Sequence, residues 1–234
     1  DDAAFKIFSK NAREYNGGVY GMKFAAPVKD TDRVAFEAKL SEKYGPTSIT
    51  ARQEDGTIVL APTSDEYFPI QISEPAAGQD LPIGYDLASA IETRTALETA
   101  ASNNQAVGTK PLTIKQNGKD TYIYFISLPL YTSGPDNVDT SDETEELKGF
   151  VIGLYDIEAI FNNVIDNSWS WDDTNSIKLD DNTGQSMVQM QVASLAGQDV
   201  VADERFRYNK QLSPIADLQW FLSGSPSKHY FEKH

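Results

Sequence analysis

Residues 66–131 read EYFPIQISEPAAGQDLPIGYDLASAIETRTALETAASNNQAVGTKPLTIKQNGKDTYIYFISLPLY, and this stretch decides the fold. Its apolar pattern predicts a strand from Tyr67 to Ser73, followed by a loop over the Pro- and Gly-bearing residues 74–83. A helix is predicted from Ala90 to about Ser102. Residues 107–131 predict a β-hairpin that turns at Asn117-Gly118. We therefore expect a sheet with a helix over it and a concave space between them.

The predicted strands of this stretch differ in their position in the sheet. Residues 122–130 alternate between two sets that are both mostly apolar or aromatic, so this strand is predicted to be central, with Tyr122 and Tyr124 on one face. In the earlier strand, Ile70 and Ile72 are predicted to share a face. Pro69 has no amide hydrogen to donate, which predicts an edge position or a bulge there.

The chain before this stretch predicts two helices and several strands. Residues 2–15 are helix-permissive and end at Asn16-Gly17-Gly18, while DRVAFEAKLSEKY (32–44) predicts a second helix that stops at Gly45-Pro46. Residues 19–28 are expected to be extended, and 48–62 to form a hairpin around Asp55-Gly56.

The chain after it begins with an acidic stretch, residues 132–146, that lacks periodicity. KGFVIGLYDI (148–157) predicts a buried strand and is followed by a short helix. The remainder predicts four strands, in SIKLDD, SMVQMQVA, the region around RFRYNKQL, and LQWFLSGSP. We expect the boundary between two half-domains at the acidic break.

Composition narrows the class of protein. The 234 residues carry a formal net charge of −15, which disfavours binding to nucleic acid or anionic lipid. The absence of cysteine excludes disulfides and thiolate chemistry. No apolar run approaches the roughly 20 residues of a membrane span. Together with the lack of an initiator Met, this leads us to expect a soluble piece of a longer protein.

Catalysis and metal binding have little support. The two histidines, His229 and His234, lie in the terminal tail, and no nucleophile-elbow, zinc-protease or phosphate-loop motif occurs. The acids at 136–146 match no calcium-loop spacing and are typical of a solvated surface loop. They are Asp136, Asp139, Asp142, Glu143, Glu145 and Glu146. The chain is therefore predicted to be no enzyme and to need no metal or cofactor.

The concave space between helix and sheet suits the binding of a small molecule. Tyrosine offers such a ligand an apolar ring and a hydroxyl. The predicted lining is Tyr67, Ile70, Ile72, Tyr85, Thr109, Leu112, Tyr122 and Tyr124. The alternative is that these side chains simply fill the core. Asp86 either accepts a hydrogen bond from the ligand or bonds backbone amides at the helix start.

Several segments, taken in order, resemble the CHASE domain, the extracytoplasmic sensory domain of membrane histidine kinases and nucleotide-cyclase-type receptors. They are DRVAFEAKLSEKYG (32–45), FPIQISEP (68–75), GYDLAS (84–89), ETRTALETA (92–100), AVGTKPLTI (106–114), LPLY (128–131) and GFVIGLYDIEAIF (149–161). The resemblance covers roughly residues 20–165, a domain-sized span.

The resemblance implies an α+β fold in which an N-terminal helix precedes two PAS-like antiparallel-sheet subdomains. On this basis residues 1–18 are the end of a stalk helix, 19–147 a membrane-distal ligand-binding subdomain and 148–234 a membrane-proximal subdomain. It also implies a membrane anchor on each side and a homodimer formed through the N-terminal helix. Plant members bind adenine-type cytokinins in the distal subdomain. There Thr109 resembles a pocket threonine, and Glu74 or Asp65 would replace the acidic residue that grips the adenine.

The sequence therefore predicts a periplasmic ligand-sensing domain of a transmembrane signal transducer. The output would be a cytoplasmic kinase of a two-component system or a nucleotide cyclase such as a diguanylate cyclase. Two alternatives stay open at this point: a soluble extracytoplasmic binding or adhesion module without signalling output, and an extracytoplasmic hydrolase. The ligand and the oligomeric state are left undetermined by the sequence.

Overall fold

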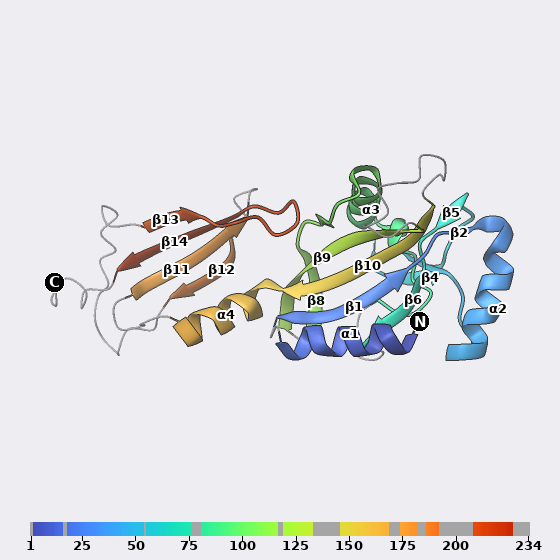
Figure 1. Cartoon of the computed structure of the whole chain (residues 1–234), viewed down its shortest axis with the longest axis horizontal. Coiled ribbons are helices and arrows are strands. Elements are labelled where there is room, and N and C mark those ends of the chain that lie inside the picture. Colours follow the sequence, from blue (N-terminus) through green and yellow to red (C-terminus); the bar gives the residue numbers. More distant parts are fainter. Residues whose placement is uncertain are drawn as a thin grey trace. The chain divides into compact units, whose positions relative to one another are not determined.

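The computed structural model describes residues 2–15, 18–53, 55–75, 81–116, 119–132, 146–168, 174–181, 186–191 and 208–226. The chain divides into two compact units, Asp1–Tyr155 and Asp156–His234. Each unit contains an antiparallel sheet, and the chain opens with a helix (Figure 1). The predicted α+β class is therefore confirmed. The predicted turn at Asn117-Gly118 lies outside the described residues.

Three α-helices are described in the first unit, α1 (Asp2–Tyr15), α2 (Arg33–Tyr44) and α3 (Ile91–Asn103). Two short 3-10 helices, Asp30–Asp32 and Leu87–Ser89, precede α2 and α3. α2 ends at Gly45, whose φ of +82° suits glycine and whose amide donates to the Ser41 carbonyl at 3.0 Å. The helices predicted at 2–15, 32–44 and 90–102 are thus confirmed.

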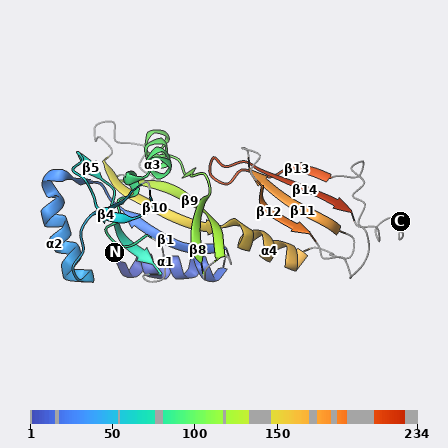
Figure 2. The same ribbon diagram turned by 180° about the vertical axis from the view of Figure 1, so that it is seen from behind.

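The main sheet of the first unit has the strand order β6-β1-β10-β9-β7, and β8 also pairs with β9. These strands are β1 (Val19–Ala25), β6 (Ile70–Glu74), β7 (Val107–Gly108), β8 (Leu112–Gln116), β9 (Lys119–Tyr131) and β10 (Leu147–Asp156). Seen from behind in Figure 2, β10 runs between β1 and β9. The central position predicted for the strand at 122–130 is confirmed.

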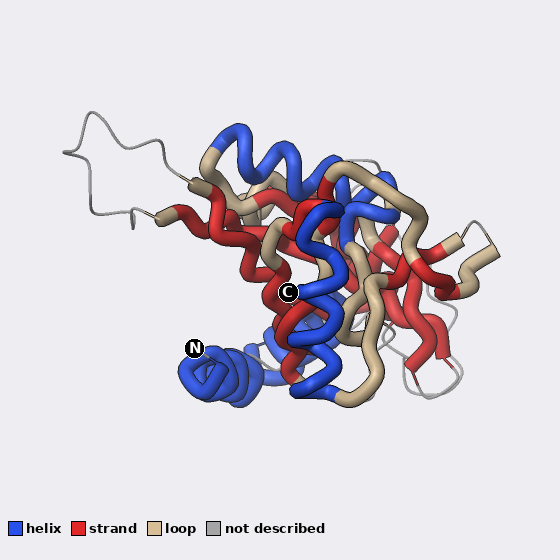
Figure 3. Tube along the Cα trace, turned by 90° about the vertical axis from the view of Figure 1, so that its right-hand side faces the viewer, coloured by secondary structure: helices blue, strands red, loops and turns tan. Residues whose placement is uncertain are grey.

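Helices cover both faces of this sheet. α3 packs on one face, where Ala96, Leu97 and Ala100 join a buried core with Phe125 and Ile152. α1 lies along β1 and β6, and its Lys6 is 3.9 Å from the Glu74 carboxylate. In Figure 3, α1, marked N, lies below the strands and α3 above them. We call the face under α3 the α3 face and the other the α1 face.

One predicted strand is divided in the structure. Instead of a single strand from Tyr67 to Ser73, the chain forms β5 (Glu66–Tyr67) and β6 (Ile70–Glu74), separated at Phe68-Pro69. β5 pairs with β2 (Val28–Lys29), in a ladder separate from the main sheet. The physical reason is Pro69, which has no amide hydrogen to continue a ladder.

The hairpin predicted at 48–62 is present as β3 (Thr50–Arg52) and β4 (Ile58–Leu60). Beside it lies a second, smaller core made of Val28, Ile49, Ala51, Ala61 and Tyr67, against which Phe36 of α2 packs. This cluster contains no α3 residue, so Tyr67 belongs to the α2 side of the unit.

The second unit contains α4 (Ile157–Ser168) and a sheet of order β12-β11-β14-β13 in its described part. The strands are β11 (Thr174–Asp181), β12 (Ser186–Gln191), β13 (Tyr208–Gln211) and β14 (Trp220–Pro226). They match the four predicted strands. The predicted division at 147/148 falls at the start of β10, whereas β10 pairs with β1 and the units divide after Tyr155. The acidic break therefore lies within the first unit.

Candidate functional site

A groove of about 470 Å³ runs between α3 and the strands beside it. Its walls come from one flank of α3, from the segment that leads into β6, and from the start of β10. The lining residues are Ser64, Asp65, Glu66, Phe68, Ala88, Arg94, Leu97, Glu98, Ala101, Ser102, Leu147 and Phe150. The helix positions 94, 97, 98 and 101 recur every three or four residues, so they form one stripe along α3.

The groove combines an apolar part with charges of both signs. Phe68 and Phe150 meet edge to face with ring centroids 5.6 Å apart, and Leu97 and Leu147 pack against the same core. Arg94 and Glu98 are exposed on α3, and Asp65 and Glu66 are exposed on the opposite wall. Such a combination suits a small molecule that carries both polar and apolar groups.

Two of the lining segments are held together by Asp86. Its buried carboxylate accepts hydrogen bonds from the Phe68 amide at 2.8 Å and the Ala88 amide at 3.0 Å. Burial raises the pKa of Asp86, against the lowering effect of these two hydrogen bonds and of nearby Arg94. Of the two roles predicted for Asp86, the structure shows the bonding of backbone amides. Asp86 thus positions the groove without lining it.

Arg94 is anchored at one nitrogen. Its Nε donates to the Ala88 carbonyl at 2.7 Å, which fixes the plane of the guanidinium group. Within the part of the chain that the structure describes, its two terminal nitrogens make no hydrogen bond. The Arg94 fork is therefore available to a carboxylate in the groove.

Some predicted pocket residues lie on the α3 face, but in its core. Ile70 and Tyr85 are buried among the α3-facing side chains, and Leu112 packs against them. Thr109 is buried, and its Oγ1 accepts a hydrogen bond from the Phe125 amide at 3.2 Å. These residues serve the packing between α3 and the sheet, and the groove itself is lined by others.

The other predicted pocket residues lie elsewhere. β6 slips by one residue at Gln71, so that Ile70 pairs with Ala25 while Ile72 pairs with Phe24. Since Phe24 and Ala25 project to opposite faces, Ile72 belongs to the α1 face, as does Glu74. The expectation that Ile70 and Ile72 share a face was wrong. The alternation of residue types along the sequence does not show a shift in the pairing between two strands.

Three tyrosines are also separated from the groove. Ile123 and Phe125 contact the α3 core, so the alternation of β9 puts Tyr122 and Tyr124 on the α1 face. Tyr67 lies in the α2 cluster, where its hydroxyl donates to Asp30 Oδ1 at 2.6 Å. The ten predicted residues therefore do not lie together in one pocket.

A buried lysine is a further feature of the α3 face. Lys23 pairs with Ser73 and Ile152 in the neighbouring strands and is fully buried. Its Nζ donates to Ser73 Oγ at 2.9 Å and to the Leu81 carbonyl at 3.2 Å. Burial lowers the pKa of Lys23 from 10.5 to about 8. The signal in the sequence was a lysine within the apolar strand VYGMKFA.

Of the groove residues, sequence reasoning named Asp65, as a possible acidic partner of the ligand, and missed the others. Arg94 and Leu97 stand in ETRTALETA, a segment that was predicted only as part of a helix. Among the described residues, no group of three or more acids or histidines is placed to hold a metal ion. The acids at 136–145 and both histidines lie outside the described residues. No described helix is long and apolar enough to cross a membrane.

Comparison with known proteins finds a matching family model and a similar histidine kinase. The family model of the CHASE domain matches residues 1–190. Hybrid signal transduction histidine kinase A of Dictyostelium discoideum is 21% identical over 249 residues, and the match covers 98% of this chain but only 11% of the kinase.

Similar solved structures come from bacterial chemoreceptors. The ligand-binding domain of the Pseudomonas aeruginosa PAO1 amino acid chemoreceptor PctC, in complex with GABA, is 13% identical with a TM-score of 0.43, over 90% of this chain and 75% of that one. The periplasmic sensory domain of Campylobacter jejuni Tlp1 is 11% identical with a TM-score of 0.48, over 92% and 74%.

Proposed function

We propose that this chain, which belongs to the CHASE domain family, senses a small molecule in the groove beside α3. As a CHASE domain it is an extracytoplasmic sensory domain of a signalling receptor, and the groove is the place where we expect the ligand. The observation that carries the proposal is Arg94, a partly anchored guanidinium facing acids across an apolar groove. We propose this site in place of the ten-residue pocket that the sequence predicted.

The charges of the groove favour a ligand with a carboxylate and an amine. The free fork of Arg94 matches the two oxygens of a carboxylate. Glu98 on the same helix and Asp65 on the facing wall can accept hydrogen bonds from an ammonium group. Phe68 and Phe150 would contact the apolar part of the ligand. We therefore propose an amino-acid-like zwitterion as the ligand class.

We further propose that the full-length receptor is anchored in the membrane on both sides of this segment and dimerises through α1. Its cytoplasmic output would be a histidine kinase or a nucleotide cyclase. A ligand can drive such an output only if it binds two conformations unequally. The membrane anchors are tested by the flanking sequence, where an apolar run of about 20 residues is expected on each side. Absence of both runs would contradict the receptor architecture.

The ligand class is tested by thermal shift with matched compounds. γ-Aminobutyrate and L-glutamine carry both charged groups, whereas butyrate has only the carboxylate and butylamine only the amine. At about 100 times its dissociation constant, a ligand adds roughly 2.7 kcal/mol to the stability. We expect the zwitterions to raise the melting temperature more than the single-charge compounds. Equal effects of all four compounds would overturn the proposed class.

Variants then locate the site. Arg94→Lys keeps the charge but loses the fork, and Glu98→Gln keeps the shape but loses the charge, so both should weaken zwitterion binding at least roughly tenfold. Arg52→Lys and Glu42→Gln are matched controls, since both residues are exposed in the same unit and do not line the groove. Binding that survives both groove variants would place the ligand elsewhere.

A further inference from the structure

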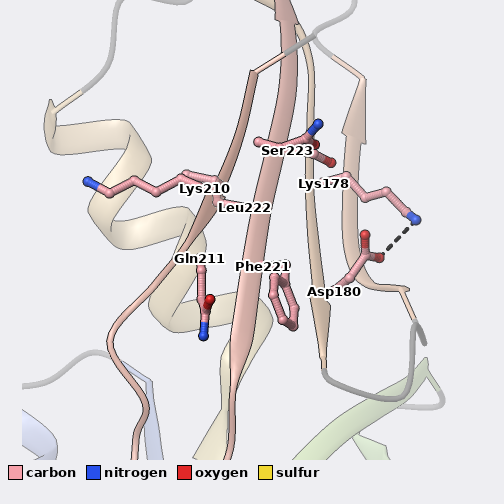
Figure 4. A pocket seen from close by; sticks show the side chains of 8 residues that line it. Lys178, Asp180, Lys210, Gln211, Phe221, Leu222 and Ser223 are labelled. Atoms are coloured by element: carbon pink, nitrogen blue, oxygen red, sulfur yellow. Dashed lines mark ion pairs between the residues drawn. The ribbon is translucent and has the colours of Figure 1, made fainter.

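A second cavity, of about 520 Å³, lies on the sheet of the second unit. It is lined by side chains from β11, β13 and β14 (Figure 4). Among the lining residues are Lys178, Asp180, Asn209, Gln211, Phe221 and Ser223. These six comprise one aromatic ring, two amides, one hydroxyl and one pair of opposite charges, and Lys210 and Leu222 also line the cavity.

The strand register gathers these side chains on one face. Phe221 pairs with Gln211 on one side and with Asp180 on the other. Ser223, two residues further along β14, pairs in the same way with Asn209 and Lys178. Directly paired residues share a face, as do residues two apart. The cavity floor is thus two rows of three side chains.

The opposite face of this sheet has another character. Leu179 and Leu222 are directly paired, and Leu179 and Trp220 are buried. The apolar core of the unit therefore lies on that side. The cavity face instead shows an aromatic ring, Phe221, that keeps 39% of its surface exposed.

The charges on the cavity face compensate each other. Lys178 Nζ lies 2.9 Å from Asp180 Oδ1, and the two residues are two positions apart on β11, on the same face. In Figure 4 a dashed line marks this ion pair, and the Phe221 ring lies between Gln211 and Asp180. The remaining polar groups of the two rows are uncharged. The two rows therefore offer hydrogen bonds in several directions around one ring without a net charge, and Lys210 pairs with Leu222, out of phase with both rows.

We propose that this face is a second ligand site, which binds a neutral polyhydroxylated molecule of the saccharide class. The C–H face of a sugar ring can pack on Phe221, as apolar surfaces do on aromatic rings. Its hydroxyls can donate to Asp180 and exchange hydrogen bonds with Asn209, Gln211 and Ser223. Within the two rows Lys178 is already paired with Asp180, so an anion or a zwitterion would have to displace that pair. This site is independent of the groove beside α3.

The experiment is saturation-transfer NMR on the whole 234-residue chain with D-glucose, D-galactose, D-mannose and maltose as probes. We expect at least one of them to bind and to lose affinity roughly tenfold in Phe221→Ala and in Gln211→Ala. Tyr208→Ala is the matched control. Tyr208 is an aromatic residue of β13 that is 50% exposed, and its position is one residue out of phase with Asn209. The Tyr208→Ala variant should bind the saccharide as tightly as the wild-type protein does.

Two further comparisons make the outcome decisive. Arg94→Lys should leave saccharide binding unchanged, so failure of the groove proposal and failure of this one are distinguishable. Far-UV circular dichroism of Phe221→Ala establishes that the sheet survives the substitution. The inference is overturned if none of the four saccharides binds, if binding persists in both Phe221→Ala and Gln211→Ala, or if glycine competes with the saccharide for the site.

Discussion

Lys23 shows how a single residue can set the pH dependence of stability. Its folded pKa of about 8 lies below its ordinary value of 10.5. Between these values the unfolded chain holds a proton at Lys23 that the folded chain has released. The free energy of unfolding therefore rises with pH across this window. At 1.36 kcal/mol per pKa unit, the rise amounts to about 3 kcal/mol.

This prediction is checked by urea denaturation at a series of pH values from about 7 to 11, spanning the two pKa values. The control is Lys23→Met, which keeps an unbranched chain of similar length and removes the titrating group. The wild-type protein should gain stability over the window relative to this variant. Parallel curves for the two proteins would show that Lys23 does not titrate as its burial implies.

Tyr67 is the second residue with a measurable role. Its hydroxyl donates to Asp30 and accepts hydrogen bonds from the Ser64 amide at 2.9 Å and from Arg33 Nη1 at 3.2 Å. Tyr67 itself is fully buried, and Tyr67→Phe breaks hydrogen bonds to the charged Asp30 and Arg33 and to the Ser64 amide, which we expect to cost about 1–3 kcal/mol of unfolding free energy.

The matched control for Tyr67 is Tyr44→Phe. Tyr44 is an exposed tyrosine whose hydroxyl donates to the Gln71 carbonyl at 3.0 Å. Because water can replace that bond, we expect a loss below roughly 0.5 kcal/mol. Equal losses in the two variants would argue against a buried network at Tyr67, and zwitterion binding should be unaffected by either substitution.

At the scale of the elements, α3 depends on small side chains. Ala100 is fully buried between α3 and the sheet. Ala100→Leu inserts three extra carbons into a packed core and should cost about 1–3 kcal/mol. Thr95→Leu, at an exposed position of the same helix, is expected to be near neutral. Urea denaturation measures both, and a harmless Ala100→Leu would contradict the close packing of α3.

Elements were easier to predict than the faces on which their residues lie. The helix ends at Gly45 and Asn104 follow from local turn chemistry, which the sequence shows directly. The face of Ile72 depends on a slip between β1 and β6, which are about 50 residues apart in sequence. The lining of the groove was equally hard to predict, because Phe68, Arg94 and Phe150 come together only through tertiary packing. The fold class and the helices could therefore be predicted from the sequence. The residues that form the site depend on strand register and tertiary packing, which the sequence does not show.

At the scale of the whole molecule, β10 links the two units without an intervening loop. It begins at the groove with Leu147 and Phe150, ends at Asp156, and is followed at once by α4 from Ile157. Asp156 Oδ1 accepts a hydrogen bond from the Ala159 amide at 2.9 Å, which ties the first turn of α4 to the strand end. Given the proposed function, this junction is where a ligand signal leaves the first unit.

Inserting Gly-Gly between Asp156 and Ile157 tests that role in the full-length receptor. Ligand binding should persist, because the groove lies entirely in the first unit, while the ligand-dependent change in output should disappear. The control is the same insertion after Asp55, in the exposed β3–β4 turn, which should preserve both properties. A receptor that still responds with the insertion at Asp156 would rule out transmission through this junction.

The direct connection of β10 to α4 also bears on how a movement of the strand could reach the helix. The backbone of a β-strand is almost fully extended, at about 3.3 Å per residue, so a strand can be displaced but hardly lengthened. Because no loop separates Asp156 from Ile157, a displacement of the end of β10 would pass directly to the first turn of α4, whereas a flexible linker would absorb it. Given the proposed function, a change of ligand specificity in the groove would leave this junction unaltered.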